Sequence, residues 1–288
     1  MYDKIEIIKL DKLGLKRDSS IFYEEITDEQ VGNIGCREDK IAKRSKYIRN
    51  TPNRFTLFGG DQIDAISPLD RRFNRETEVE FDFDQQRAKW QKLHQALFEV
   101  HKKQTIKSTW ISSPEENYKH EGINEKVWGL LWGNHEYKIP YLTKSLIDNQ
   151  FCKQNQLHFL GAKCMIGLRV MWKNEILHEW SLAIMHGSGG GTVENMFKGM
   201  KQNWEADAYF CSHLHQKKIQ PEIVYAFDWR TGRVYQKDII LVNTGSFQEP
   251  ITNDVDGYMD RKNSIIATGV GTSTVEFNGY DGSMKGHL

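Results

Sequence analysis

Six apolar runs in this chain resemble buried strands, and five of them lead directly into Asp, Asn, Gln, Glu or His residues. In chain order the runs are SIFYEEI, RFTLFGG, VWGLLWG, SLAIMHG, AYFCSHLH and IILVNTGSF. Short apolar runs of this kind, bounded by turn-forming residues, predict core strands. Because α/β proteins bind their ligands beyond the carboxyl ends of strands, we expect the polar residues to gather at the rim of a sheet.

Segments with a helical pattern follow each of the first three runs. CREDKIAKRSKYIRN and DFDQQRAKWQKLHQALFEVHKK carry apolar residues at helical spacing, and PYLTKSLIDNQFCKQ begins with a proline suited to a first helical turn. This alternation favours an α/β sheet in the first half. In the second half, KCMIGLRVMWKNEILHEWSLAIM and PEIVYAFDWRTGRVYQKDIILV predict hairpins. We therefore expect one mixed sheet, or two packed sheets, with helices outside.

The composition indicates a globular protein without a strong overall charge. The 288 residues are 39% hydrophobic, and 39 basic residues balance 39 acidic ones, so any contact with nucleic acid must be local. No run approaches the roughly 20 apolar residues of a membrane span, and the charged start MYDKIEIIKLDK is unlike a secretory signal. We expect no membrane partner and a cytoplasmic location. A single domain over residues 1–288 is expected, with an insertion at about 67–123.

The residues at the five strand ends are of types that bind metals. They are Asp28 and Gln30, Asp61 and Asp64, Asn134, His135 and Glu136, His186, and His213 and His215. A single Asp after a strand usually caps a turn, so the joint order of these residues is the informative feature. The last two histidines are two apart, so both imidazoles project to one side of an extended segment. A pair of divalent cations needs roughly eight ligand positions, which these endings supply.

Taken together, these segments resemble the motifs of calcineurin-like metallophosphoesterases. The family's pattern runs D-x-H, G-D-x-x-D, G-N-H-[DE], a histidine, and G-H-x-H. The matching segments are Asp28-Glu29-Gln30, Gly60–Asp64, Gly133–Glu136, His186 and Ser212–His215. The resemblance suggests the phage and bacterial branch that includes DNA-repair exonucleases and related phosphoesterases. It implies an α/β (α+β) four-layer sandwich, in which two mixed β-sheets are flanked by helices and the active site lies at strand ends.

The resemblance also implies a role for each matched residue. One cation would be held by Asp28, Gln30, Asp61 and His215, and a second by Asp61, Asn134, His186 and His213, with Asp61 bridging the two. Manganese is the expected metal, with Fe, Zn, Ni or Mg as alternatives. His135 would stabilise the transition state or protonate the leaving oxygen. Asp64 and Glu136 would orient His135 or a ligand, although a simple structural hydrogen bond is an equal alternative for both.

Two positions depart from the family's pattern. Gln30 stands where a histidine is usual, and Ser212 stands where a glycine is usual. An amide oxygen is a harder and weaker donor than imidazole, so Gln30 should loosen one metal site and favour Mn or Mg. An alternative alignment places Asp11 and Leu13 at the first motif. We prefer Asp28, because Leu13 cannot bind a metal and the run before Asp28 predicts a better strand.

The implied function is hydrolysis of phosphate esters by a hydroxide that two cations hold and activate. A phosphodiesterase or nuclease is favoured, a phosphomonoesterase is the alternative, and a non-catalytic metal-binding scaffold is a third hypothesis. Arg71 and Arg72 could contact phosphate, and KIAKRSKYIRNTPNR could steer a nucleic acid, but such charges are more often solvated surface. GSGGGTVEN lacks the lysine of a P-loop, so we interpret it as an active-site loop. The oligomeric state stays open.

Overall fold

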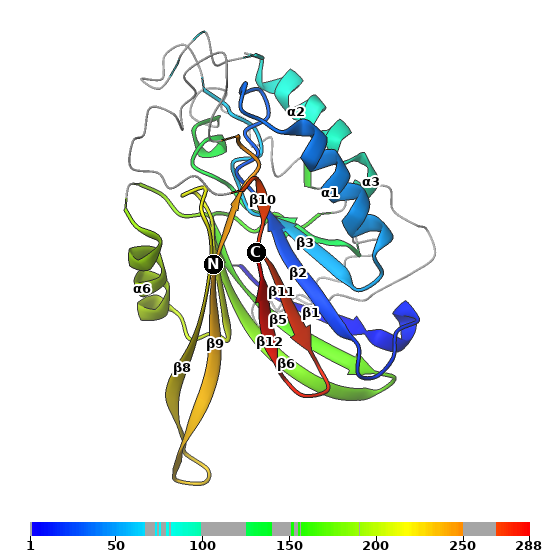
Figure 1. The fold of residues 1–288 in the computed structure, drawn as a ribbon, viewed down its shortest axis with the longest axis vertical. Coiled ribbons are helices and arrows are strands. Elements are labelled where there is room, and N and C mark those ends of the chain that lie inside the picture. The colour runs from blue at the N-terminus through cyan, green and yellow to red at the C-terminus, as the bar shows by residue number, and fades with distance from the viewer. Residues whose placement is uncertain are drawn as a thin grey trace, which may run out of the picture.

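Two mixed β-sheets pack face to face in this protein, and helices cover both outer faces (Figure 1). The computed structural model describes residues 2–66, 73, 75, 79–80, 82–98, 125–139, 151–152, 155, 157–189, 191–249 and 269–288. The four-layer α/β architecture predicted from the sequence is confirmed within these residues. No helix among them is long and apolar enough to cross a membrane.

The larger sheet has the order β1-β5-β6-β7-β9-β10, and β8 pairs with β9 beside this path. Its strands are β1 (Tyr2–Lys9), β5 (Lys163–Trp172), β6 (Glu175–Met185), β7 (Ala208–Cys211), β8 (Lys217–Asp228), β9 (Arg233–Ser246) and β10 (Gly271–Thr272). β7 runs parallel to both β6 and β9, whereas β5–β6 and β8–β9 are antiparallel. Both predicted hairpins are therefore present.

The smaller sheet has the order β12-β11-β2-β3-β4. Its strands are β2 (Ser20–Ile26), β3 (Arg54–Phe58), β4 (Val127–Leu130), β11 (Thr274–Asn278) and β12 (Met284–His287). β2, β3 and β4 are parallel, so their carboxyl ends lie along one edge. The polar residues that follow these three strands are thereby brought to the same rim of the sheet.

Helices flank the two sheets on opposite sides (Figure 1). The smaller sheet is covered by α1 (Glu38–Asn50), α2 (Phe83–Leu93) and α3 (Gln95–Phe98), and the larger sheet by α6 (Val193–Asn203). The predicted helix DFDQQRAKWQKLHQALFEVHKK is interrupted at His94, where α2 ends. Most of PYLTKSLIDNQFCKQ, most of the expected insertion at 67–123, and both Arg71 and Arg72 lie outside the described residues.

Three apolar clusters separate the layers and hold the strands in place. Between the sheets, Tyr23 stacks on Trp128 with ring centroids 4.5 Å apart, and the edge of Phe210 meets Tyr23 at 4.9 Å. A second cluster lies between the smaller sheet and α1 and α2, and a third lies under α6. Close packing on both faces fixes where each strand ends, and therefore where the residues after it are placed.

Candidate metal centre

The ten candidate site residues follow the carboxyl ends of β2, β3, β4, β6 and β7. The loops that carry them are joined by backbone hydrogen bonds. The Asp28 N–H donates to the Gly60 carbonyl over 3.0 Å, and the Ser212 N–H donates to the His186 carbonyl over 3.1 Å. Strand ends from both sheets thus form one connected rim.

Asp61, His186 and His213 form the densest group of potential ligands among the described residues. Each offers one ligand atom, and these atoms all lie within 4.8 Å of one another. His186 Nε2 is 3.1 Å from Asp61 Oδ2, and both residues are 1% exposed. A carboxylate and two imidazoles at this spacing could hold a divalent metal ion. These three residues are also three of the four ligands that the resemblance implies for one cation.

The hydrogen bonds of His186 fix which of its nitrogens faces the centre. Nδ1 lies 2.9 Å from the Gly59 carbonyl oxygen, which can only accept a hydrogen bond, so Nδ1 carries the proton. Nε2 then faces Asp61, and this buried atom makes no hydrogen bond within the described residues. Without a metal this nitrogen would carry a second proton beside the carboxylate, whereas a bound cation would take the place of that proton. The geometry of His186 therefore fits a metal ligand.

A second group of potential ligands adjoins the first. His215 Nε2 is 3.1 Å from Asp28 Oδ1 and 3.4 Å from Gln30 Nε2. Asp28 Oδ1 is also 3.9 Å from His186 Nε2, so Asp28 connects the two groups. The structure thus brings Asp28, Gln30 and His215 together beside Asp61. Their donor atoms suit a divalent cation.

The buried charges of the centre attract positive charge. Burial on its own would raise the pKa of Asp28 and Asp61, but the neighbouring imidazoles, His215 and His186, lower both values. Conversely, burial would lower the pKa of His186, yet Asp61 and Asp28 raise it to about 10. In each case the attraction between opposite charges outweighs desolvation. Divalent cations would satisfy the same carboxylates.

The side-chain oxygen of Asn134 is a further candidate metal ligand. Its Oδ1 is buried and has no hydrogen-bond partner within the described residues. Buried amide oxygens are almost always paired in folded proteins, so an orphaned one calls for an explanation. A cation beside this oxygen would supply that missing partner.

Several of the candidate ligands have a strained, left-handed backbone conformation. Among the described residues, seven that are not glycine have a positive φ, and five of these are candidate ligands. The five are Asp28, Gln30, Asp61, His213 and His215, with φ between 47° and 72°. Each such conformation costs on the order of 1 kcal/mol or more, and strain of this kind concentrates at functional sites.

His135 faces the centre and is held from behind by Asp64. His135 Nε2 is 3.8 Å from Asp61 Oδ2, while Nδ1 contacts the Asp64 carbonyl oxygen and lies 3.3 Å from Asp64 Oδ1. The His135 N–H also donates to Asp61 Oδ1 over 2.9 Å. Asp64 thus orients the ring so that Nε2 points toward Asp61.

Glu136 joins the backbone of two loops through hydrogen bonds of its carboxylate. Its carboxylate accepts N–H groups from Asp61 at 3.0 Å, Ile63 at 3.0 Å and Gly133 at 3.1 Å. A fully buried carboxylate with three donors locks the loops after β3 and β4 together. It therefore positions the ligand Asp61 through the main chain.

Ser212 is a contributor whose role the motif pattern does not reveal. Its Oγ lies 3.1 Å from His186 Nδ1 and 3.4 Å from the Gly59 carbonyl oxygen. The hydroxyl therefore sits beside the hydrogen bond that sets the orientation of His186. The alternative first motif at Asp11 is not part of the centre, because Asp11 Oδ1 accepts the Lys173 N–H at the β5–β6 turn. The sequence marks Ser212 only as a departure from the motif, and its place beside His186 reveals the role.

Comparison with known proteins finds similarity only among solved structures. No protein-family model and no curated protein matches the chain. Vacuolar protein sorting 29 from Cryptosporidium parvum aligns with 94% of this chain and 97% of its own, at 10% identity and a TM-score of 0.39. Vps29 from Entamoeba histolytica, complexed with zinc, aligns with 93% of this chain and 97% of its own, at 11% identity and a TM-score of 0.32.

Proposed function

We propose that this protein is a dinuclear metal-dependent phosphoesterase of the calcineurin-like superfamily and that it hydrolyses phosphodiesters, with nucleic acid as the expected substrate class. The arrangement around Asp61 is the observation that carries this proposal. His186 and His213 present ligand atoms within 4.8 Å of Asp61 and of each other, and the outward nitrogen of His186 is already committed to a carbonyl oxygen. An assembly of buried carboxylates and imidazoles without a cation would be costly to keep.

The resemblance implies two ligand sets, and the two groups of residues support them. Asp28, Gln30, Asp61 and His215 would hold one cation, and Asp61, Asn134, His186 and His213 the other. Manganese suits this mixture of carboxylate, amide and imidazole donors, and Fe, Zn, Ni or Mg are alternatives. When bound, such cations supply a water molecule of lowered pKa and neutralise charge on the phosphoryl oxygens.

His135 would act on the substrate directly. With Nδ1 held by Asp64, its Nε2 would carry a proton to the leaving oxygen or stabilise charge on the phosphoryl group. Asp64 and Glu136 would be positioning residues, the first for the His135 ring and the second for the Asp61 backbone.

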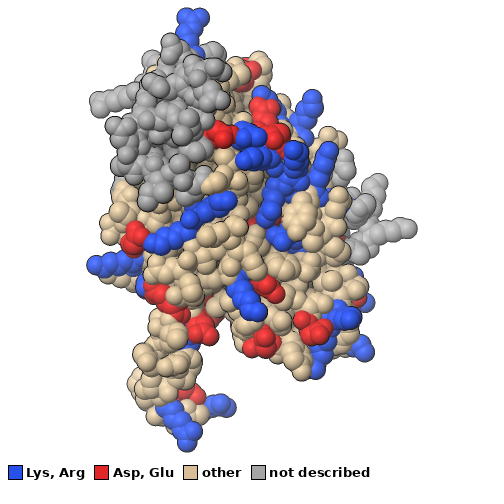
Figure 2. Space-filling model, viewed as in Figure 1, with Lys and Arg blue, Asp and Glu red and all other residues tan. Residues whose placement is uncertain are grey.

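A cationic cleft beside the centre supports a diester rather than a monoester. We define it by Lys40, Lys43 and Arg44 of α1 together with Lys217 of β8, which line a cavity of about 390 Å³. Figure 2 shows Lys and Arg side chains gathered over α1. Phe247 also lines this cleft, and its N–H donates to the Asp28 carbonyl over 3.2 Å, so the cleft adjoins the candidate ligands. Cations beside the scissile phosphate would favour a substrate with neighbouring phosphates.

The charges of this cleft are only partly neutralised. Arg44 pairs with the buried carboxylate of Glu24, whereas Lys40 and Lys217 have no ion pair within the described residues. Burial and the nearby charges of Lys40 and Arg44 lower the pKa of Lys217, which reflects how closely these cations lie. A phosphate backbone would relieve that repulsion.

Hydrolysis of bis-(p-nitrophenyl) phosphate and of p-nitrophenyl phosphate, with Mn²⁺ added to the purified chain, tests this function. We expect the diester to be cleaved faster, and Asp61→Asn to abolish cleavage of both. If only the monoester is turned over, the protein is a phosphomonoesterase. A labelled single-stranded and a labelled duplex oligonucleotide then show whether nucleic acid is cleaved.

Gln30 favours a second candidate function, a non-catalytic scaffold that keeps a weakened metal site. An amide in place of an imidazole would loosen one of the two cations. This candidate predicts stoichiometric Mn²⁺ binding by calorimetry but no hydrolysis of either ester by the wild-type chain. Measurable turnover that disappears in Asp61→Asn would rule it out.

A further inference from the structure

The β8–β9 hairpin projects beyond the rest of the fold as a two-stranded arm (Figure 1). We define the arm as residues 222–238, which include the distal halves of both strands and the turn between them. A two-stranded ribbon with no further cover is at best marginally stable in water. The arm therefore needs something to pack against it.

One face of the arm is an exposed apolar stripe. Tyr225 pairs with Gln236, and Phe227 pairs with Val234, so alternate residues of the two strands share this face. Trp229 packs against Phe227 with ring centroids 4.9 Å apart. The exposed fractions are 58% for Ile223, 73% for Tyr225, 47% for Phe227, 90% for Trp229 and 64% for Val234.

The same face is core at the base of the hairpin. Ile240 of β9 is buried between the two sheets, and Ile219 of β8 packs against that core. Farther along, the smaller sheet no longer covers the hairpin, and the side chains on the same face become exposed. The stripe is therefore a core-type surface that lacks its second sheet. Another β-ribbon stacked on it would restore the two-sheet packing found at the base.

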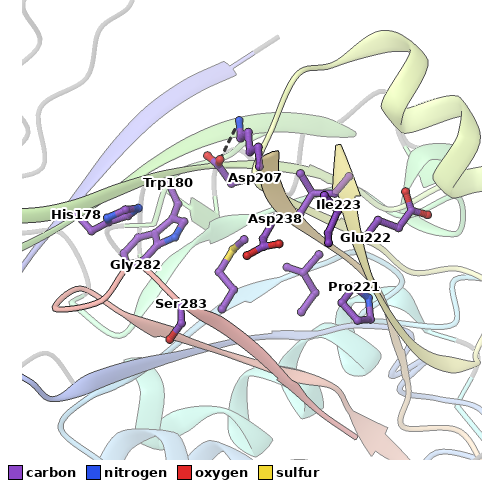
Figure 3. Close-up of a pocket in the computed structure, with 13 residues that line it drawn as sticks. His178, Trp180, Asp207, Pro221, Glu222, Ile223, Asp238, Gly282 and Ser283 are labelled. Carbon is purple, nitrogen blue, oxygen red and sulfur yellow. Dashed lines mark ion pairs between the residues drawn. The ribbon is translucent and has the colours of Figure 1, made fainter. Parts of the chain in front are cut away.

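A cavity of about 740 Å³ lies at the base of the arm on this face (Figure 3). Pro221, Ile223 and Asp238 line it from the hairpin, Trp180 lines it from β6, and Met284 lines it from β12. The cavity and the stripe are continuous, because Ile223 belongs to both. It is large enough to receive an aromatic side chain.

We propose that a second copy of this chain covers the stripe, with the two arms packed antiparallel and face to face about a twofold axis at Tyr225. Tyr225 is four positions from Trp229 on one side and four from Pro221 on the other. Pro221, Tyr225 and Phe227 share one face of the ribbon, and Trp229 in the turn packs against Phe227. The twofold axis therefore seats Trp229 of each copy over the Pro221 side of the partner's cavity. A surface that carries both a protruding aromatic residue and a cavity for it is self-complementary, as an isologous dimer requires.

The exposed area agrees with a dimer. Taking about 200 Å² for each fully exposed aromatic side chain, the three aromatic residues of the stripe expose on the order of 400 Å² per copy. Ile223 and Val234 extend this area toward the roughly 800 Å² per partner of a standard interface. A patch of this size is comparable to the largest apolar patch on a typical monomer, which is often an interaction site.

The charge of the arm favours protein over polyanion as the occupant. Three acidic residues, Glu222, Asp228 and Asp238, are balanced by three basic ones, Arg230, Arg233 and Lys237. A neutral arm has no net attraction for nucleic acid or an anionic membrane. The whole chain also has a net charge of zero, so two copies do not repel each other.

Sedimentation velocity of the full chain between about 1 and 100 µM tests the proposal, because interfaces of standard size have Kd values from the micromolar range downward. We expect twice the 33.6 kDa of one chain. Tyr225→Lys would place two like charges at the axis and weaken the dimer at least 30-fold, the size of a central hot-spot loss of about 2 kcal/mol.

Tyr235→Lys is the matched control, because Tyr235 is a 49% exposed tyrosine on the opposite face of the same arm, paired with Ala226. This variant should remain dimeric. Circular dichroism and thermal unfolding check that both variants are folded. A wild-type chain that is monomeric at 100 µM overturns the proposal, as does a dimer that survives Tyr225→Lys or that Tyr235→Lys disrupts to the same extent.

Discussion

Some features of the candidate centre could be predicted residue by residue from the sequence, and others could not. The order of Asp, Asn and His residues along the chain was enough to predict that they gather at one rim, because parallel strands bring their carboxyl ends to one edge. The left-handed backbone at Asp28 and His215 and the place of Ser212 beside His186 were not predictable. These features depend on contacts between residues more than 20 positions apart, which no local pattern encodes.

At this scale, His135→Ala tests the chemistry separately from metal binding. We expect kcat to fall by roughly 10²–10⁴, the usual contribution of a general acid or base. Mn²⁺ affinity should stay within about twofold of the wild-type value, because His135 is not among the proposed ligands. Steady-state kinetics and calorimetry measure the two quantities. His287→Ala, on exposed β12, serves as the control. An unchanged rate in His135→Ala would remove this residue from the mechanism.

Gln30→His tests the departure from the family's pattern. Gln30 lies next to His215, with the side-chain nitrogens 3.4 Å apart, so an imidazole at position 30 would still face the same group of ligands. We expect the weaker of two metal sites to tighten about tenfold, which corresponds to ~1.4 kcal/mol. The gain should be larger for Zn²⁺ than for Mn²⁺, because imidazole is the softer donor. Metal titration by calorimetry measures this, and a looser site in the variant would contradict the assignment of Gln30.

Among the secondary-structure elements, the strands rich in aromatic and β-branched residues were predictable, and β1 was not. Lys4 and Glu6 occupy inward-facing positions of β1, where they pair with each other, and Lys4 donates to the Trp128 carbonyl over 2.6 Å. A buried ion pair reverses the apolar alternation that identifies a strand. The break between α2 and α3 also depends on buried polar contacts that the local pattern does not encode. His94 Nε2 lies 2.6 Å from Glu29 Oε1, and His94 Nδ1 lies 2.7 Å from Ser45 Oγ.

The loops after β3 and β4 pack so closely that only glycine fits between them. A Cβ added to Gly133 would lie 1.9 Å from Asp61 Oδ1 and 2.1 Å from the Asp61 nitrogen. Gly133→Ala must therefore push the two loops apart and displace Asp61. We expect a loss of about 1–3 kcal/mol in the free energy of unfolding, as for other overpacked sites, together with loss of Mn²⁺ binding.

Gly199→Ala is the matched control for that change. Gly199 lies within α6, and an added Cβ there meets no atom within 4 Å. Because alanine is the better helix former, this variant should be neutral or stabilised by up to about 1 kcal/mol. Urea denaturation of both variants measures the difference. A Gly133→Ala protein that binds Mn²⁺ like the wild type would show that the two loops can separate without moving Asp61.

For the whole molecule, the candidate centre joins the two sheets. Asp28, Asp61 and Asn134 follow strands of the smaller sheet, whereas His186 and His215 follow strands of the larger one. Cations held by residues from both sheets would cross-link the sandwich at its rim. Binding that occurs only in the folded state adds stability, about 2.7 kcal/mol when the free metal is at 100 times its Kd.

Mn²⁺ should therefore raise the midpoint of thermal unfolding by about 5 °C or more relative to the protein in EDTA, given the usual change of midpoint per kcal/mol in large domains. Asp61→Asn should lose most of this shift, because it removes the charge shared by both ligand groups. Asp11→Asn is the control, since Asp11 accepts only a backbone N–H at the β5–β6 turn, and it should keep the full shift. If Asp11→Asn loses the shift and Asp61→Asn keeps it, the metal lies elsewhere and the first motif belongs to the alternative alignment.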